Sequence, residues 1–302
     1  MTQVTTTPSA HESSRTGFPT PAGVKPRVMR PGPEEQDPAR FRRRRRRIEI
    51  GLAWLAPFVF LLAWEGASRA ALVNPQYFPA PSTVWGTLVE LIRNGFIPRN
   101  LYITLKRVMA GYAMGVLSGG VAGMMMGLSR KVRATLDGLL TALYTVPKLS
   151  LLPLLMMIFG LGEAPKIIMI ALTSFFFMWM TTMSAFLGIS AGYDETARSF
   201  GAGRWQRFRH VEFPAALPQI FFGLRLTIGI AMLVVVGVEF VQANSGIGWA
   251  IWNAWTLLAA SRMYACIMVV AVTGVVLTQA VRVVGKVLLP WSRGGATDAT
   301  IF

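Results

Sequence analysis

A few polar side chains, three of them ionisable, stand inside long apolar segments of this sequence, where polar groups are unusual. Lys148, Arg225 and Glu239, together with Gln242 and Asn244, are the clearest examples. Ionisable groups inside a membrane segment are costly and commonly mark a solute or ion path. Lys148 and Arg225 would lower the barrier for an anion, so they are candidates for a translocation path, together with Glu239 and Asn244. A structural alternative stays open: Lys148 bonds free carbonyl groups, and Arg225 braces a loop or pairs with Glu239.

A polar loop joins two apolar segments, residues 167–189 and residues 219–238. It runs from Asp194 to Pro214, and its middle, residues 204–209, mixes cations with aromatic side chains. That mixture is typical of a short amphipathic helix at a membrane surface. We therefore expect the loop to touch another protein. The alternative is a solvated surface helix without a partner.

Motifs for bond-breaking chemistry are absent from the sequence. It has no phosphate-binding Gly-x-x-x-x-Gly-Lys-Ser/Thr loop, no Gly-x-Ser-x-Gly elbow and no His-Glu-x-x-His pair. His11 and His210 lie in dissimilar segments, which argues against a metal site. Cys266 is the single cysteine, so an internal disulfide is excluded. We expect a chain that is not an enzyme and binds no cofactor itself.

The composition favours a membrane protein. Hydrophobic residues make up 53% of the chain and charged residues 15%, and the mean hydropathy is +0.48, values beyond those of a soluble domain. The formal net charge of +16 would suit nucleic acid, but no basic run is interleaved with aromatic residues on an otherwise polar domain. We therefore expect contact with the lipid bilayer and none with nucleic acid.

The chain divides into a polar tail, a membrane domain and a second, short tail. Residues 1–47 are expected to form a disordered, basic cytoplasmic tail, which ends in an unbroken arginine run at 42–47. A six-span membrane domain is expected at residues 48–291, with its core at 100–290, and residues 292–302 are expected to form a cytoplasmic tail. The expected spans are residues 48–71, 106–128, 135–160, 165–190, 215–241 and 263–289. Basic clusters after the second and fourth spans and near the C-terminus place both termini in the cytoplasm.

Two patterns shape the expected bundle. Glycines recur every fourth residue along the second span, in one stripe where another helix packs closely. The stripe consists of Gly111, Gly115, Gly119, Gly123 and Gly127. Pro147 and Pro153 interrupt the third span and should kink it, because proline removes a hydrogen-bond donor. The freed carbonyl groups need protein or water around them, so we expect this span inside the bundle. Residues 83–92 are expected to form a short amphipathic helix on the outer surface.

The polar loop also resembles a family pattern. Type I ABC importer permeases carry a cytoplasmic EAA loop, in which Glu-Ala-Ala is followed by a glycine and later by Ile-x-Leu-Pro. That register is occupied here by Glu195, Ala197, Gly201, Val211, Phe213 and Pro214. Thr196, Val211 and Phe213 depart modestly from the pattern in size or shape.

The resemblance extends over about residues 79–291. Several segments resemble the branch of permeases that imports nitrate, taurine and aliphatic sulfonates. They are residues 78–84 (FPAPSTV), 105–111 (LKRVMAG), 146–149 (VPKL), 152–154 (LPL), 159–163 (FGLGE) and 223–225 (GLR).

The resemblance implies an all-α integral membrane fold of about six transmembrane helices, with a cytoplasmic coupling helix at residues 193–207. This helix would seat in a groove of an ABC ATPase, and that separate subunit would hold ATP and Mg. Two ATPase copies would serve two permease copies, expected to be a homodimer. The residues implied in ATPase coupling are Glu195, Thr196, Ala197, Gly201, Arg204, Arg207 and Pro214. Glu195 would cap the helix start or pair with a partner cation, Gly201 would permit a tight turn, and Pro214 would end the loop.

The sequence thus predicts the permease subunit of an ATP-driven importer in a bacterial inner membrane. An external substrate-binding protein would hand over a small anionic solute of the sulfonate, nitrate, taurine or carboxylate type. The main alternative is a secondary transporter driven by an ion gradient, which should show inverted repeats and paired broken helices, whereas only the third span looks broken. An intramembrane enzyme lacks a visible nucleophile or metal cluster, and a membrane scaffold leaves the loop register unexplained.

Overall fold

The computed structural model describes residues 38–291, with the side chains of residues 38–50, 53 and 54 outside the description. Residues 1–37 of the expected N-terminal tail (residues 1–47) and the whole expected C-terminal tail (292–302) lie outside the described residues. Helix α2, Pro38–Arg69, begins ten residues before the expected first span at residue 48, so the arginine run is part of a helix and not of an irregular tail. A compact unit begins at Leu61 and contains all the elements that follow α2.

Every regular element in the described part of the chain is helical, which confirms the all-α prediction. After α2 come α3 (Pro81–Arg93), α4 (Phe96–Leu128), α5 (Arg130–Thr145), the 3₁₀ turn η1 (Lys148–Leu151), α6 (Leu152–Phe159), α7 (Ala164–Leu187), α8 (Ala191–Ser199), α9 (Arg204–Arg207), the π-helical turn η2 (Phe208–Glu212), α10 (Phe213–Gln242), α11 (Ile247–Thr256) and α12 (Ala260–Leu288).

Four helical segments are long and apolar enough to cross a membrane: α4, α7, the run Arg204–Gln242 and α12. The bent pair of α5 and Lys148–Phe159 makes a fifth if it counts as one span. Helix α2 covers the first expected span, but much of it falls where side chains lie outside the description, so the sixth span stays a prediction. These spans agree with the expected multi-pass architecture.

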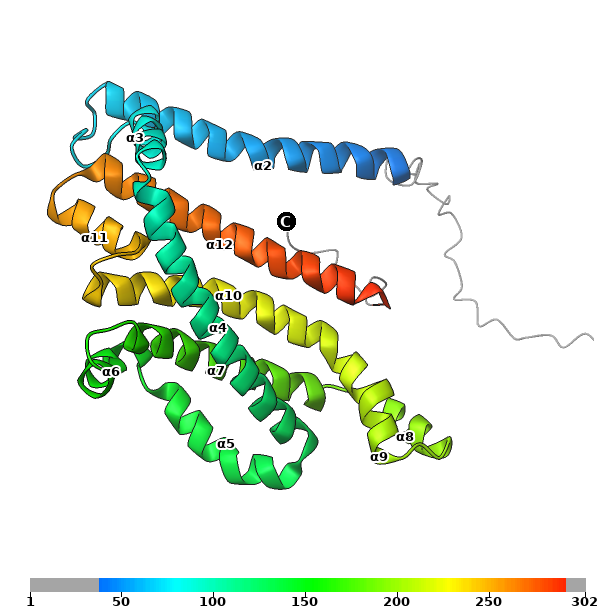
Figure 1. Ribbon diagram of the computed structural model, residues 1–302. Coiled ribbons are helices and arrows are strands. Elements are labelled where there is room, and N and C mark those ends of the chain that lie inside the picture. The colour runs from blue at the N-terminus through cyan, green and yellow to red at the C-terminus, as the bar shows by residue number, and fades with distance from the viewer. Residues whose placement is uncertain (1–37, 292–302) are drawn as a thin grey trace, which may run out of the picture. The chain divides into compact units, whose positions relative to one another are not determined.

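The compact unit has two distinct ends (Figure 1). The short helices α3 and α11 lie at one end, and α8 and α9 lie at the other. The amphipathic segment expected at residues 83–92 is helix α3, which buries Val84, Leu88 and Leu91. The long helices therefore separate two groups of short helices, which lie in different surroundings.

Helix α4 starts earlier than the expected boundary at residue 106. Asn94 accepts a hydrogen bond from the Phe96 N–H (3.0 Å), and Gly95 between them is left-handed, with φ +76°. This turn starts the helix at Phe96 and places Arg107 three turns inside it. A cation that the expected boundary put at the edge of a span is therefore an interior residue of a helix.

The glycine stripe of α4 faces α7. A Cβ atom added at any of the five glycines would lie within 3 Å of atoms of α7, mostly backbone atoms or Cβ atoms of residues 167–186. Backbones approach this closely only where side chains are missing. The spacing of the glycines thus corresponds to an interface in which α4 and α7 pack backbone against backbone.

The third expected span is broken between Thr145 and Lys148. Helix α5 and the segment Lys148–Phe159 meet at 85°, with Pro147 before η1 and Pro153 in the first turn of α6. The predicted kink is therefore present, and it is sharp enough for a broken span or a re-entrant loop.

The position of this broken span differs from the expectation that it lies inside the bundle. Helix α5 has no buried residue, and α6 buries only Leu152. One face of α5 packs on Phe176 and Trp179 of α7 through residues that include Leu136 and Leu140. The remaining faces stay open in the single chain, so the span lies at the periphery of this unit.

Candidate functional site

The polar loop consists of two short helical pieces joined by a glycine turn. Helix α8 ends before Gly201, whose φ of +76° is left-handed, and α9 follows at Arg204. The single helix expected over residues 193–207 is therefore wrong. A residue with a Cβ atom pays about 1–2 kcal/mol for the left-handed conformation, and glycine does not, so Gly201 is the point where the helix breaks.

Pro214 does not end the loop, as we had expected it to. Helical structure runs without interruption from Arg204 to Gln242, and Pro214 lies in the first turn of α10. The preceding turn η2 is π-helical, so the regular α-helical ladder is already interrupted where proline lacks its N–H.

Asp194 ties the two pieces of the loop together. Its carboxylate pairs with Arg198 Nη2 (2.7 Å) and with Arg207 Nη1 (2.5 Å) across the glycine turn. The ring of Phe208 stacks on Phe186 of α7 with centroids 6.5 Å apart, which anchors the loop on the bundle. The loop therefore has a defined conformation and is packed against α7.

The outer surface of the loop is open. Helix α8 has no buried residue, and Phe200 and Trp205 are 86% and 67% exposed. Of the residues expected to couple to an ATPase, Glu195, Thr196, Gly201 and Arg204 are exposed, and Ala197, Arg207 and Pro214 are half-buried. Thr196 Oγ1 donates to the Gly192 carbonyl (2.7 Å). The structure thus brings these residues to one end of the molecule.

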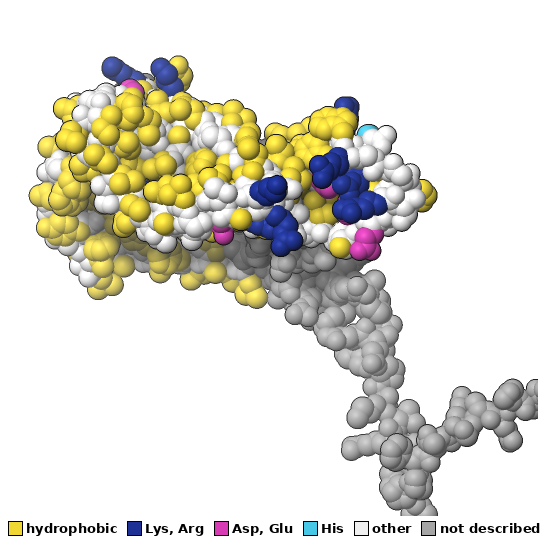
Figure 2. Space-filling model, turned by 90° about the horizontal axis from the view of Figure 1, so that it is seen from below, with side chains coloured by type: hydrophobic (Ala, Val, Ile, Leu, Met, Phe, Trp, Pro, Cys, Tyr) yellow, Lys and Arg dark blue, Asp and Glu magenta, His cyan; other side chains and the backbone are white. Residues whose placement is uncertain are grey.

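A cavity of about 950 Å³ lies between the loop and the turn from α4 to α5. Its lining is rich in cations: Arg130, Lys131, Arg198, Arg204 and Arg207. Figure 2 shows Lys and Arg side chains gathered on this part of the surface, beside a largely apolar remainder. An acidic or amphipathic partner surface would complement it.

A second polar region lies at the opposite end of the unit and is buried. Arg107, 1% exposed, donates from Nη1 to Glu239 Oε1 (2.6 Å) and to the Ser245 carbonyl (2.7 Å). Its Nε and Nη2 atoms donate to the two carboxylate oxygens of Glu163 at 2.5 and 2.7 Å. Lys166, 5% exposed, also pairs with Glu163 (3.0 Å). We call Arg107, Glu163, Lys166 and Glu239 the ion cluster.

Glu239 is fully buried, and its carboxylate is fully bonded. Thr104 Oγ1 lies 3.0 Å from both oxygens, and the Gly248 N–H donates to Oε2 (2.8 Å). Gly246, at φ +108°, and Gly248 wrap the α10–α11 turn round this carboxylate, because a Cβ atom at either one would lie within 3 Å of Glu239. The carboxylate thus sits at the N-terminus of α11, where the helix dipole favours an anion.

Glu163 differs from Glu239 because its side chain is 55% exposed. It precedes the first residue of α7, outside the spanning helices. The guanidinium of Arg107, with help from Lys166, lowers the pKa of Glu163 to about 2. The carboxylate is therefore ionised throughout the physiological pH range.

The four residues proposed for a translocation path do not come together. Lys148 donates to the Tyr144 carbonyl (2.8 Å) at the break after α5, and its ammonium lies 4.4 Å from the Tyr144 ring centroid. Arg225 is half-buried in the middle of α10. It does not pair with Glu239, as one alternative held, because Arg107 occupies that carboxylate.

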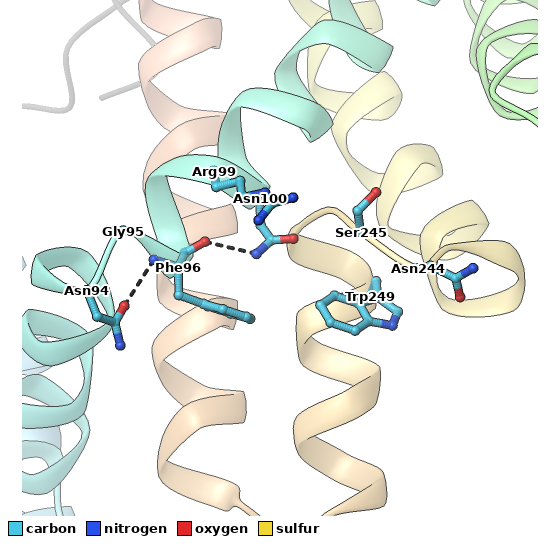
Figure 3. A pocket seen from close by; sticks show the side chains of 8 residues that line it. All are labelled: Asn94, Gly95, Phe96, Arg99, Asn100, Asn244, Ser245 and Trp249. Atoms are coloured by element: carbon cyan, nitrogen blue, oxygen red, sulfur yellow. Dashed lines mark hydrogen bonds between the residues drawn. The ribbon is translucent and has the colours of Figure 1, made fainter.

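Asn244 has a different setting from the other three. It lines a cavity of about 530 Å³ together with Asn94, Arg99, Asn100 and Ser245 (Figure 3). Ser245 also contacts the ion cluster, since its Oγ accepts from Arg107 Nη2 (3.2 Å). The cavity and the ion cluster therefore share a wall.

Reasoning from sequence missed Arg107 and Glu163. Arg107 lies 56 positions from Glu163 and 132 positions from Glu239, so no local pattern joins it to these carboxylates. Both residues fall within segments that carried the family resemblance, residues 105–111 and 159–163. The presence of a cation and a carboxylate in these two segments was the sequence signal that could have marked them as candidates for a long-range ion pair.

Comparison with known proteins identifies the family. A family model described as "Binding-protein-dependent transport system inner membrane component" matches residues 115–289, more than half of the chain. The chain belongs to this family. It is a multi-pass inner membrane component of a transport system that depends on a binding protein.

Relatives of this family component agree with the predicted branch. The permease protein SsuC of Bacillus subtilis (strain 168) is 34% identical over 78% of this chain and 86% of its own length. The taurine transport system permease protein TauC of Escherichia coli (strain K12) is 32% identical over 82% and 90%. The nitrate import permease protein NrtB of Synechococcus elongatus is 28% identical over 78% and 88%.

Solved structures agree on the fold. The MetNI methionine ABC transporter matches with a TM-score of 0.53 at 20% identity, over 63% of this chain and 92% of that chain. An amino acid ABC transporter matches with a TM-score of 0.51 at 18% identity, over 63% and 91%. The predicted fold of a type I ABC importer permease is thereby confirmed.

Proposed function

We propose that this family component is the permease of an ATP-driven importer and that the α8–α9 loop receives the motion of a separate ATPase. The main supporting observation is that the loop is exposed but ordered. Asp194 joins its two helical pieces, and Phe208 packs it against α7. Its exposed aromatic and cationic side chains have the composition of a protein interface. The chain has no phosphate-binding loop of its own.

Glu195 supports this assignment because its side chain has no hydrogen bond or ion pair with any residue that the structure describes. It lies exposed in α8 beside Asp194, which has two arginine partners. An exposed carboxylate without an internal partner is available for a cation on the ATPase. We propose that Glu195, Thr196, Ala197, Gly201, Arg204, Arg207 and Pro214 position or contact the ATPase.

The cargo that this proposal favours is a small anion. The named relatives transport taurine or nitrate, and SsuC is named for aliphatic sulfonates. Arg99 and three asparagine side chains line the cavity at the end opposite the loop. We propose that an external binding protein delivers the anion at this end, that two permease copies form the path, and that both termini are cytoplasmic.

The proposal is tested by purifying the tagged chain from its host in mild detergent and identifying bound proteins by mass spectrometry. We expect a phosphate-loop ATPase in the wild-type sample and its loss with Gly201→Asp. The matched control is Gly95→Asp, since Gly95 also has a φ of +76° and a Cβ atom at either glycine meets nothing within 4 Å. Purification without an ATPase, with uptake that follows an ion gradient, would favour the secondary transporter.

A further inference from the structure

The ion cluster contains two cations, Arg107 and Lys166, and two carboxylates, Glu163 and Glu239. The charges balance, but the two carboxylates are held very differently. Glu239 is fully buried and bonded by Thr104, Arg107 and the Gly248 N–H. Glu163 is more than half exposed, and within the described part of the chain its side chain pairs with Arg107 and Lys166. Glu239 is thus a fixed, buried part of the cluster, whereas Glu163 is a surface residue that contacts the two cations.

We propose that Arg107 and Lys166 form an oxyanion site, which Glu163 occupies in this conformation and from which an anionic cargo displaces it. This inference rests on the proposed function, because it assumes an anionic cargo. Without Glu163 the cluster would carry one net positive charge, which matches a monoanion.

The geometry of Arg107 suits this class of ligand. Its Nε and Nη2 atoms contact the two oxygens of Glu163 in a parallel, two-pronged arrangement. A sulfonate presents two oxygens to a guanidinium in the same way, and such paired hydrogen bonds add specificity as well as strength. The guanidinium is already desolvated and oriented by Glu239 and the Ser245 carbonyl. An incoming anion would therefore find a preorganised site.

Two features of the surroundings bear on this displacement. Ser245 contacts Arg107 and also lines the cavity of about 530 Å³ that contains Arg99 and Asn244 (Figure 3). Glu163 holds the α6–α7 turn against α4, and the turn is otherwise tied to α10 by a hydrogen bond from Gln242 to the Leu161 carbonyl (2.8 Å). Displacement of Glu163 would free one of these two attachments, so anion arrival would loosen the turn.

The experiment is equilibrium dialysis of radiolabelled methanesulfonate with the complex purified through the tagged chain, without nucleotide. Glu163→Gln keeps the size of the side chain and removes its charge. We expect this variant to bind methanesulfonate at least tenfold more tightly than the wild type, and Glu163→Gln/Lys166→Gln to lose that gain. Neutral dimethyl sulfone should not compete. Glu90→Gln, an exposed carboxylate of α3, is the matched control and should bind as the wild type does.

Equal affinity of Glu163→Gln and wild type, or equal competition by dimethyl sulfone, would overturn the proposal. If Glu163→Gln does not remain folded, Glu163→Asp serves instead, since it keeps the charge but shortens the reach, and it should show a smaller gain; no gain in that variant overturns the proposal. Binding needs neither ATP nor a binding protein. Absence of an ATPase from the purified sample would therefore count against the proposed function and leave this readout intact.

Discussion

The two polar ends of the molecule are built as opposites. At the loop, one carboxylate, Asp194, lies between two arginines, and the surface round it is open. At the other end, one arginine, Arg107, lies between two carboxylates and is 1% exposed. Each end also has a glycine with positive φ: a Cβ atom on Gly201 would meet nothing within 4 Å, but one on Gly246 would meet Glu239. Polar groups at the loop lie open on the surface of the single chain, whereas Arg107 and Glu239 at the other end join α4 to α10.

The strongest test of this contrast removes the charge of one arginine at each end. Arg107→Gln leaves the buried carboxylate of Glu239 without its cation, and an uncompensated buried charge costs about 3–5 kcal/mol. We expect little folded protein by size-exclusion chromatography in detergent. Arg207→Gln removes a half-buried cation but leaves Asp194 paired with Arg198, so no carboxylate loses its last partner and the loss of folded protein should be much smaller. Similar losses for the two variants would contradict the distinction.

Glu195→Arg should produce the reverse pattern. The side chain of Glu195 is exposed and is not engaged within the described part of the chain, so the thermal midpoint should stay within about 2 °C, as for most surface changes. Uptake of labelled taurine, methanesulfonate or nitrate in the reconstituted importer should fall at least tenfold. Retained uptake would contradict the coupling role, and a lowered midpoint would show that the residue stabilises the fold.

The two glycines give a third comparison. Gly201→Ala changes only a left-handed backbone, at about 1–2 kcal/mol. Gly246→Ala adds a Cβ atom against the buried Glu239 carboxylate, so overpacking of about 1–3 kcal/mol adds to the backbone strain. The melting temperature should fall further for Gly246→Ala. Equal shifts would mean that the α10–α11 turn gives way at no cost.

The smallest expected effect concerns pH. The pKa of Glu163 lies at about 2, below its ordinary value of 4.5, so its ion pair stabilises the fold above pH 4.5 and weakens as the pH falls from 4.5 towards 2. The difference in melting temperature between wild type and Glu163→Gln should stay constant from about pH 5 to pH 8, since the carboxylate is ionised throughout. A difference that shrinks within that range would contradict the assigned partner.

Local patterns could be read from the sequence, and long-range pairs could not. The four-residue spacing of the glycines predicts one packed face because the helix repeat alone fixes it. The break at Pro147 follows from the missing donor of proline. The pairs of Arg107 depend on how distant segments meet, 56 and 132 positions away. The start of α4 at Phe96 depends on a turn whose Gly95 has a positive φ. Sequence alone does not reveal this turn, so the predicted span began at residue 106 and placed Arg107 at its edge.

Helix α7 connects the two ends. Glu163 of the ion cluster directly precedes its first residue, and near its last residue Phe186 supports the loop through Phe208. Its 24 residues span about 36 Å. Because α4 contacts it through glycines, backbone against backbone, few flexible side chains lie between the two helices to absorb movement. We expect α4 and α7 to move as one rigid unit, so that a tilt of α7 at the loop end is transmitted to Glu163 with little loss.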